Sequence, residues 1–304
     1  MVLFCTLVSF VVTACGPAQP VTASPPQASL LEFVGEWGMK GEGPGELAEP
    51  VAIAVDLNDR VYLADRRTGL LQKFEPTGVP LLAYADSSVR TASALAVDSG
   101  GAIYLADARN GRVWIHFPDG DLLRNFRVTA QRTAAGAFGF CVTAEGRIVV
   151  PDPNGGRVQV YTAAGRLESA WAMPSSAGKP ARPIAAAAGL DEFVYIADAA
   201  SGRIAKYTHR GAQVALWEPL ADADAPLRGI AVSRNHVFAL RGQKPQLEAW
   251  TFEGQRVLTD AFGGRFDAEP PAWLYFAVSR DEQVFVLDSG RAKVMRFRLK
   301  LQRP

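Results

Sequence analysis

The stretch Val61-Tyr62-Leu63-Ala64-Asp65 returns five times along the chain, each time as an apolar run. The later copies are IYLAD (103–107), IVVPD (148–152), VYIAD (194–198), VFALR (237–241) and VFVLD (284–288). Their final residues lie 42 to 47 residues apart. A repeat of this length with strand-like composition is typical of β-propeller blades, so the copies predict an all-β, six-bladed propeller with four antiparallel strands in each blade.

Two further features keep the register of the repeat. An aromatic ring or a histidine stands nine positions after each copy, at Phe74, His116, Tyr161, Tyr207, Trp250 and Phe297. A glycine stands thirteen positions after the first five copies, at Gly78, Gly120, Gly165, Gly211 and Gly254. Glycine suits a tight hairpin that needs a positive φ, so each unit is predicted to end in a glycine turn and an outer strand.

The two ends of the repeat region complement each other. The sixth unit has no outer strand, because only RLKLQRP (298–304) follows its ring, whereas LLEFVGEW (30–37) resembles an outer strand without a blade. An open sheet edge is a site of unwanted pairing. We therefore predict that the N-terminal strand completes the last blade, and that residues 30–304 form a single propeller domain.

The repeat region resembles the NHL-repeat family of six-bladed propellers over about residues 30 to 299. The matching stretches are WG (37–38), GEGPGEL (41–47) with Pro50, AIAVD (52–56), the YLAD phrases, and GRV, GRV and GRI at 111–113, 156–158 and 202–204. This family is a scaffold class, and a fold does not by itself give a function.

The amino end has the features of a targeting segment. Residues 1–12 (MVLFCTLVSFVV) are apolar but too short to span a bilayer as a helix, and VTACG (12–16) follows directly. Small residues before a cysteine resemble the lipobox of bacterial lipoproteins. This resemblance implies a signal peptide at 1–14, lipidation of Cys15, and membrane attachment through that residue. An ordinary secretory signal with a chance cysteine is the alternative.

The residues after Cys15 predict a tether. PAQPVTASPPQAS (17–29) contains little that could pack in a core, so residues 15–29 are expected to be a Pro-rich linker. The expected location is the bacterial cell envelope, lipid-anchored on the periplasmic or outer-membrane side. Cys141 lies in an apolar strand context, GFCV (139–142), and we expect it to be an inert core thiol.

Composition excludes several classes. The chain has 304 residues, 48% of them hydrophobic, and a formal net charge of +1. Such a balance argues against a nucleic-acid partner that relies on a strong positive field, and against intrinsic disorder. RNA binding, as in tripartite-motif NHL proteins, would also conflict with an export signal. We expect a monomer.

The repeated aspartate is interpreted as structural. A cation follows four of the copies after five residues, which predicts turn-spanning pairs Asp107–Arg112, Asp152–Arg157, Asp198–Arg203 and Asp288–Lys293. A residue that recurs in every blade is more readily explained by the blade than by one active site. In the fifth unit Arg241 replaces the aspartate and Gln246 replaces the cation.

An enzyme is the alternative to a binding module. The NHL resemblance includes amidating lyases, which hold a metal with histidines, and related six-bladed lactonases hold calcium. His116, His209 and His236 are predicted to lie outside the channel, so we expect no catalytic residue, no metal site and no cofactor. Should there be an activity, it would belong to the amidating-lyase or lactonase kind, with a site at the channel mouth.

Arginines gather in the turns between second and third strands and in the loops between blades. The candidate ligand residues are Arg66, Arg67, Arg109, Arg132, Arg182, Arg241 and Arg291. They predict a non-catalytic binding or scaffold face for an anionic part of a protein, a glycan or another partner. A solvated surface of mixed charge is the alternative, since acids such as Glu42 and Glu49 lie in the same loops.

Overall fold

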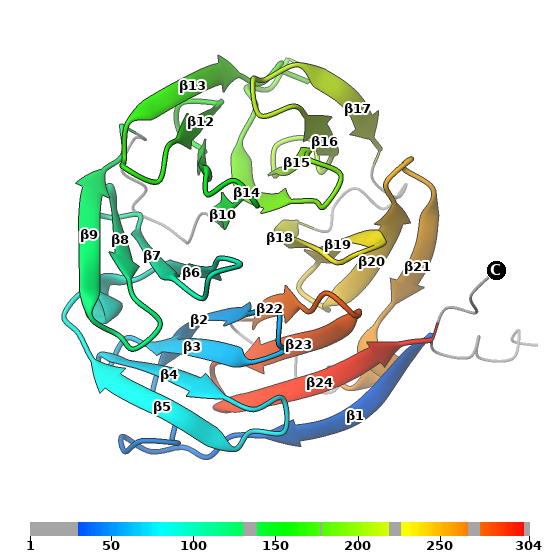
Figure 1. Ribbon diagram of the computed structural model, residues 1–304. Coiled ribbons are helices and arrows are strands. Elements are labelled where there is room, and N and C mark those ends of the chain that lie inside the picture. Colours follow the sequence, from blue (N-terminus) through cyan, green and yellow to red (C-terminus); the bar gives the residue numbers. More distant parts are fainter. Residues whose placement is uncertain (1–29, 130–138, 177, 219–225, 267–273, 301–304) are drawn as a thin grey trace, which may run out of the picture.

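The computed structural model describes residues 30–129, 139–176, 178–218, 226–266 and 274–300. Across these residues the strands form six separate sheets arranged in a ring, each with four antiparallel strands (Figure 1). The prediction of an all-β, six-bladed propeller is therefore confirmed.

Each blade follows one repeat of the sequence. Blade 1 holds β2 (Pro50–Val55), β3 (Val61–Asp65), β4 (Leu70–Phe74) and β5 (Pro80–Ala85); blade 2 holds β6 (Ala94–Val97), β7 (Ile103–Asp107), β8 (Arg112–His116) and β9 (Leu122–Arg127). Blade 3 holds β10 (Cys141–Val142), β11 (Ile148–Asp152), β12 (Arg157–Tyr161) and β13 (Leu167–Ala172). Blade 4 holds β14 (Pro183–Ala188), β15 (Val194–Asp198), β16 (Ile204–Tyr207) and β17 (Gln213–Trp217).

The last two blades complete the ring. Blade 5 holds β18 (Leu227–Val232), β19 (His236–Arg241), β20 (Gln246–Thr251) and β21 (Arg256–Asp260). Blade 6 holds β22 (Leu274–Val278), β23 (Gln283–Asp288), β24 (Lys293–Leu299) and, from the other end of the chain, β1 (Leu31–Trp37). In this pairing Leu31 lies opposite Leu299 and Trp37 lies opposite Val294, so the predicted closure by the N-terminal strand is confirmed.

The hydrophobic core is divided among the seams between blades. The seam of blades 1 and 2, for example, joins Tyr62 and Leu71 to Leu95 and Leu105, and five equivalent clusters fill the other seams of the described ring. Because both faces of a blade pack on neighbours, both faces must be apolar. This requirement explains why the second strands are continuous apolar runs and do not alternate.

The recurring rings and glycines belong to one packing device. A ring on the outer strand of one blade lies against the third-strand ring of the next, as with Trp37 on Phe74 at 4.8 Å and Trp171 on Tyr207 at 5.5 Å between centroids. The outer ring also covers the next glycine turn. A Cβ on Gly78, which has a φ of +90°, would stand 2.4 Å from the Trp37 ring, so this turn excludes any side chain.

The turns divide the propeller into two faces. The arginine face is formed by the turns between second and third strands, at residues 66–69, 108–111, 153–156, 199–203, 242–245 and 289–292. The opposite face is formed by the turns between first and second strands (56–60, 98–102, 143–147, 189–193, 233–235, 279–282) and between third and fourth strands (75–79, 117–121, 162–166, 208–212, 252–255). The pair Leu31 and Leu299 lies at the end of blade 6 that belongs to the opposite face.

Helix is scarce in the described part of the chain. Two 3₁₀ turns, η1 (Val89–Thr91) and η2 (Phe262–Gly264), are its helical segments. Among the described residues there is no helix with the length and apolarity needed to cross a bilayer.

Candidate functional site

Exposed arginines do gather on the arginine face. Arg66, Arg67, Arg109 and Arg291 are exposed in its turns, and Arg182 is exposed directly before β14. The turn that carries the first two is held from the next loop, because Arg90 donates to the carbonyl oxygens of Arg67 at 2.5 Å and Thr68 at 2.7 Å. Arg66 and Arg67 therefore project from a turn that is held in place.

The ion pairs on this face are open to solvent. Arg67 Nε lies 2.8 Å from Glu42 Oε1 and Arg66 Nη1 lies 3.4 Å from Glu49 Oε1, and all four side chains are about half exposed or more. Exposed pairs of this kind contribute about 0–1 kcal/mol. Neither Arg109 nor Arg182 forms an ion pair with any residue that the structure describes. An incoming anion would thus meet cations that are free or weakly held.

The prediction was wrong for Arg241. Its side chain is buried, and Nε lies 2.6 Å from Glu248 Oε2, whose carboxylate is fully buried. A second nitrogen donates to the Gly202 carbonyl oxygen at 2.6 Å. A cation that takes the place of the buried aspartate needs a buried counter-charge, and Glu248 supplies it. Arg132 lies outside the described residues.

Three of the four expected turn pairs are also not ion pairs. Arg157 Nε does bind Asp152 Oδ2 at 3.0 Å. Arg112 instead donates to Asn125, Arg203 binds Glu218 at 2.9 Å, and Lys293 donates to the Gly38 carbonyl oxygen at 2.8 Å. The aspartates of these three pairs, Asp107, Asp198 and Asp288, are at most 4% exposed. The long side chains of the three cations extend past them to partners nearer the solvent.

The repeated aspartates are anchored by backbone N–H groups. Asp65 accepts from Ala48 N at 2.7 Å and from Glu49 N at 2.9 Å, so it binds the loop that enters its blade. Asp107 accepts from Asn110 N and Asp152 from Gly155 N, both at 2.9 Å within the turn. Hydrogen bonds to an ionised acceptor are among the stronger ones in proteins. These carboxylates therefore hold loops and turns in place.

Sequence reasoning missed Tyr275, which interrupts the repeat on the inner strand β22 and lies partly buried against the seam of blades 6 and 1. It pairs with Leu287 at the level where the other inner strands carry Ala52, Ala94, Ala185 and Gly229. Burial raises the pKa of its hydroxyl, nearby Arg66 opposes that shift, and Glu49 adds to it. Alignment of the six inner strands, with small residues in four of them, is the signal that could have found it.

The histidines lie in three different blades. His116 is fully buried in β8, with Nε2 3.2 Å from Ser88 Oγ and Nδ1 3.1 Å from the Gly120 carbonyl oxygen. His209 lies in the turn 208–212, and His236 Nδ1 lies 2.6 Å from Glu282 Oε1. Burial would raise the pKa of Glu282, but hydrogen bonds from His236, Ser233 and Asn235 and the His236 charge lower it overall.

Two other features bear on chemistry. The part of the chain that the structure describes holds no group of three or more His, Cys, Asp or Glu side chains that could bind a metal ion. Cys141 lies half-buried in β10, and burial raises the pKa of its thiol, which disfavours the reactive thiolate.

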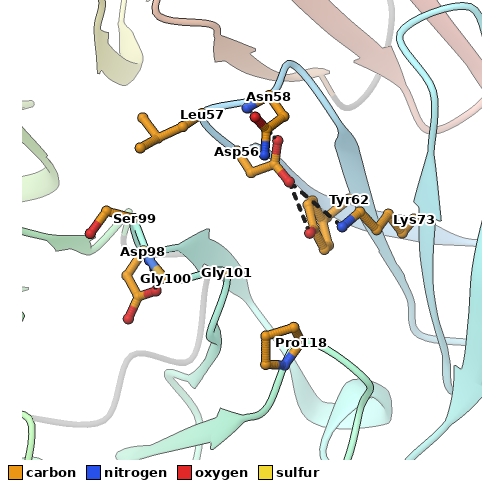
Figure 2. A pocket seen from close by; sticks show the side chains of 10 residues that line it. All are labelled: Asp56, Leu57, Asn58, Tyr62, Lys73, Asp98, Ser99, Gly100, Gly101 and Pro118. Carbon is orange, nitrogen blue, oxygen red and sulfur yellow. Dashed lines mark hydrogen bonds and ion pairs between the residues drawn. The ribbon is translucent and has the colours of Figure 1, made fainter.

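The opposite face has a hollow of about 200 Å³ between blades 1 and 2 (Figure 2). Asp56, Leu57, Asn58, Tyr62 and Lys73 line it from blade 1, and Asp98, Ser99, Gly100, Gly101 and Pro118 line it from blade 2. The Asp56 carboxylate accepts from the Tyr62 hydroxyl at 3.0 Å and lies 3.7 Å from Lys73 Nζ. Sequence reasoning missed this place as well.

Comparison with known proteins supports the fold and goes no further. No protein-family model matches the chain, and no curated protein sequence matches it. A streptogramin B lyase structure superimposes with a TM-score of 0.59 at 14% identity, over 88% of this chain and 97% of the lyase.

Virginiamycin B lyase from Staphylococcus aureus gives a TM-score of 0.60 at 11% identity, over 88% of this chain and 99% of that chain. A catalytically inactive histidine-to-alanine variant of that lyase with quinupristin gives 0.61 at 12% identity, with the same coverage. At such identities the likeness establishes a shared propeller fold.

Proposed function

We propose that the protein is a lipid-anchored, extracytoplasmic binding or scaffold module whose arginine face captures an anionic segment of a protein or a glycan. The observation that carries this proposal is the pair of exposed arginines, Arg109 and Arg182, without an ion-pair partner among the described residues, beside the solvent-open pairs of Arg66 and Arg67. Guanidinium groups favour carboxylate, phosphate and sulfate partners because their donors match planar oxygen pairs.

The anchor is the second part of the proposal. Cys15 would carry the lipid, and residues 15–29 would tether the propeller in a bacterial envelope. Because β1 starts on the opposite face, the tether would approach from the side away from the arginines. The arginine face would then remain accessible to partners in the aqueous compartment.

Retention on a sulfated-glycan matrix and on immobilised polyglutamate tests the binding face. Arg66→Glu, Arg67→Glu and Arg109→Glu combined should weaken binding by about tenfold or more, since each exposed charge contact contributes about 0.2–1 kcal/mol. The matched control is Arg166→Glu, Arg210→Glu and Arg280→Glu, which makes the same charge change among exposed residues of the opposite face. Equal loss in both triples would reduce the effect to net charge and refute the proposal.

Labelling with radioactive palmitate tests the anchor separately. The full chain should incorporate the label and float with membranes, and Cys15→Ser should do neither. Label that persists in Cys15→Ser would refute lipidation at this residue while leaving the arginine-face test intact.

The second candidate is a propeller enzyme with a site at the channel mouth, of the amidating-lyase or lactonase kind. Tyr275 favours it, because a phenol near Arg66 and Glu49 interrupts the repeat where other blades have small residues. The lyase names of the structural neighbours give a first substrate to try. Loss of quinupristin during incubation with the protein, abolished by Tyr275→Phe, would favour this candidate over the binding module.

A further inference from the structure

Two seams of the ring contain the same three side chains. Lys73 in β4 and Lys206 in β16 each stand eight residues after the aspartate that ends the preceding strand. Each ammonium lies beside a tyrosine of that strand, Tyr62 or Tyr195, at 4.9 and 5.5 Å from the ring centroid. Each tyrosine hydroxyl donates to a carboxylate from the turn before it, which is Asp56, the first residue of its turn, or Asp191, the third.

Between blades 4 and 5, protein side chains fill the space around this lysine, tyrosine and carboxylate. Lys206 is buried, lies 2.8 Å from Asp191 Oδ2, and donates to the Phe252 carbonyl oxygen at 3.1 Å. The ring of Phe193 lies 4.4 Å from Lys206 Nζ and that of Phe252 lies 5.8 Å from it. The Phe252 ring also stacks on Tyr195 at 6.0 Å. Aromatic faces and a carbonyl thus surround this ammonium.

The copy between blades 1 and 2 is the hollow of Figure 2. Lys73 Nζ lies 3.7 Å from Asp56 Oδ2, too far for a hydrogen bond, and no described carbonyl oxygen accepts a hydrogen bond from it. Its side chain is 24% exposed, against 10% for Lys206. In Figure 2 the Lys73–Tyr62–Asp56 group lies across the hollow from Pro118.

Two differences in sequence remove the aromatic rings that cover the lysine in the filled copy. The turn 56–60 ends in Arg60 where the turn 189–193 ends in Phe193, and Arg60 forms an ion pair with Glu75. Pro118 stands two residues after His116, the position that Phe252 holds after Trp250. Both phenylalanines that cover Lys206 therefore have no counterpart around Lys73.

We infer that the hollow binds an aromatic ring that carries an adjacent carbonyl oxygen, as a phenylalanine residue of a peptide does. The filled copy is the pattern for this ligand: the ring takes the place of the Phe252 ring, and the carbonyl accepts from Lys73 as the Phe252 carbonyl accepts from Lys206. The volume of about 200 Å³ exceeds the roughly 150 Å³ in which a benzene molecule binds. Asp56 balances the charge of Lys73, and the other carboxylate of the lining, Asp98, accepts from Ala102 N and from the Tyr104 hydroxyl, so a neutral ligand fits.

Ligand-observed NMR titration of the full-length protein with N-acetyl-phenylalanine amide tests this inference. Binding in the millimolar range is expected, and N-acetyl-leucine amide should bind several-fold more weakly because it lacks the ring. A glycine-flanked phenylalanine pentapeptide is the second probe. Tighter binding of the pentapeptide assigns a peptide ligand, and equal binding assigns a small aromatic amide.

Variants locate the binding. Pro118→Phe copies the filled seam and should weaken binding by at least about tenfold, and Lys73→Met should weaken it by about three- to tenfold through loss of one hydrogen bond. The matched control is Ala163→Phe, at the equivalent turn position of blade 3, because in the seam of blades 2 and 3 Ile115 stands in place of the lysine. No measurable binding, equal binding of the leucine amide, or unchanged binding by both Pro118→Phe and Lys73→Met would overturn the inference. Success or failure here leaves the arginine-face proposal untouched, since the two sites lie on different faces.

Discussion

Two seams of the propeller, between blades 4 and 5 and between blades 1 and 2, each contain a lysine, a tyrosine and a carboxylate. They differ in the side chains that surround the lysine. In the first, Phe193 and Phe252 bury Lys206 as part of the core. In the second, Arg60 and Pro118 leave Lys73 beside a hollow. The difference teaches that a repeat protein can gain a cavity by losing two core side chains, with no new backbone.

The largest expected contrast is in stability. Lys206→Met should lower the free energy of unfolding by about 3 kcal/mol, because it leaves the largely buried Asp191 carboxylate without its cation. Lys73→Met should lower it by less than about 1 kcal/mol, because this ion pair is longer and more exposed. Thermal unfolding followed by circular dichroism measures both. Equal losses would break the distinction between a core lysine and a lysine at a cavity.

The next effect comes from opening the filled seam. Phe252→Ala should cost about 2 kcal/mol, less than a fully buried phenylalanine, because its side chain is half-buried. The same change should create a second site for N-acetyl-phenylalanine amide, seen as a second binding event in the NMR titration. Phe117→Ala, at a residue 44% exposed, is the control and should change stability by less than about 0.5 kcal/mol. A single binding event in Phe252→Ala would contradict the equivalence of the seams.

The smallest expected effect is on the alkaline side of the pH profile. Burial and the carboxylates of Asp56 and Asp191 raise the pKa of Tyr62 and Tyr195 above 10. A raised folded-state pKa gives stability that is present below the unfolded value near 10 and is lost as the pH rises above it. Each tyrosine should therefore lower the free energy of unfolding by about 1 kcal/mol between pH 10 and pH 11.

Urea unfolding at pH 8 and pH 11 measures this loss. Tyr62→Phe and Tyr195→Phe should each flatten the decline between the two pH values, whatever their cost at pH 8. A decline that runs parallel to that of the parent in both variants would show that neither hydroxyl titrates with unfolding.

The architecture was predictable because several independent sequence signals indicate each strand. The apolar phrase, the ring and the glycine recur in one register, so Trp37, Phe74 and Gly78 each point to the same hairpin. The unmatched ends of the repeat predicted the pairing of β1 with β24. Agreement among local signals of this kind is what makes a sequence specify one fold.

The contacts of the arginines were less predictable from the sequence, because a long side chain can reach several different partners. Arg112 and Arg157 stand at equivalent positions, yet one donates to Asn125 and the other to Asp152. In the sequence Arg241 has the appearance of a surface cation. Its buried ion-pair partner, Glu248, lies seven residues further on, in the next strand. The hollow depends on Pro118 and Arg60, which carry no signal until the six units are aligned with the lysines in register.

The shared blade also sets the order of events during synthesis. The contact of β1 with β24 joins positions 31 and 299, so the ring cannot seal while any of the last strand is still missing from the growing chain. Closing so long a loop is entropically costly and belongs to the end of folding. A chain cut short by even one blade would carry an unpaired β1 as a free edge, which makes truncated products aggregation-prone.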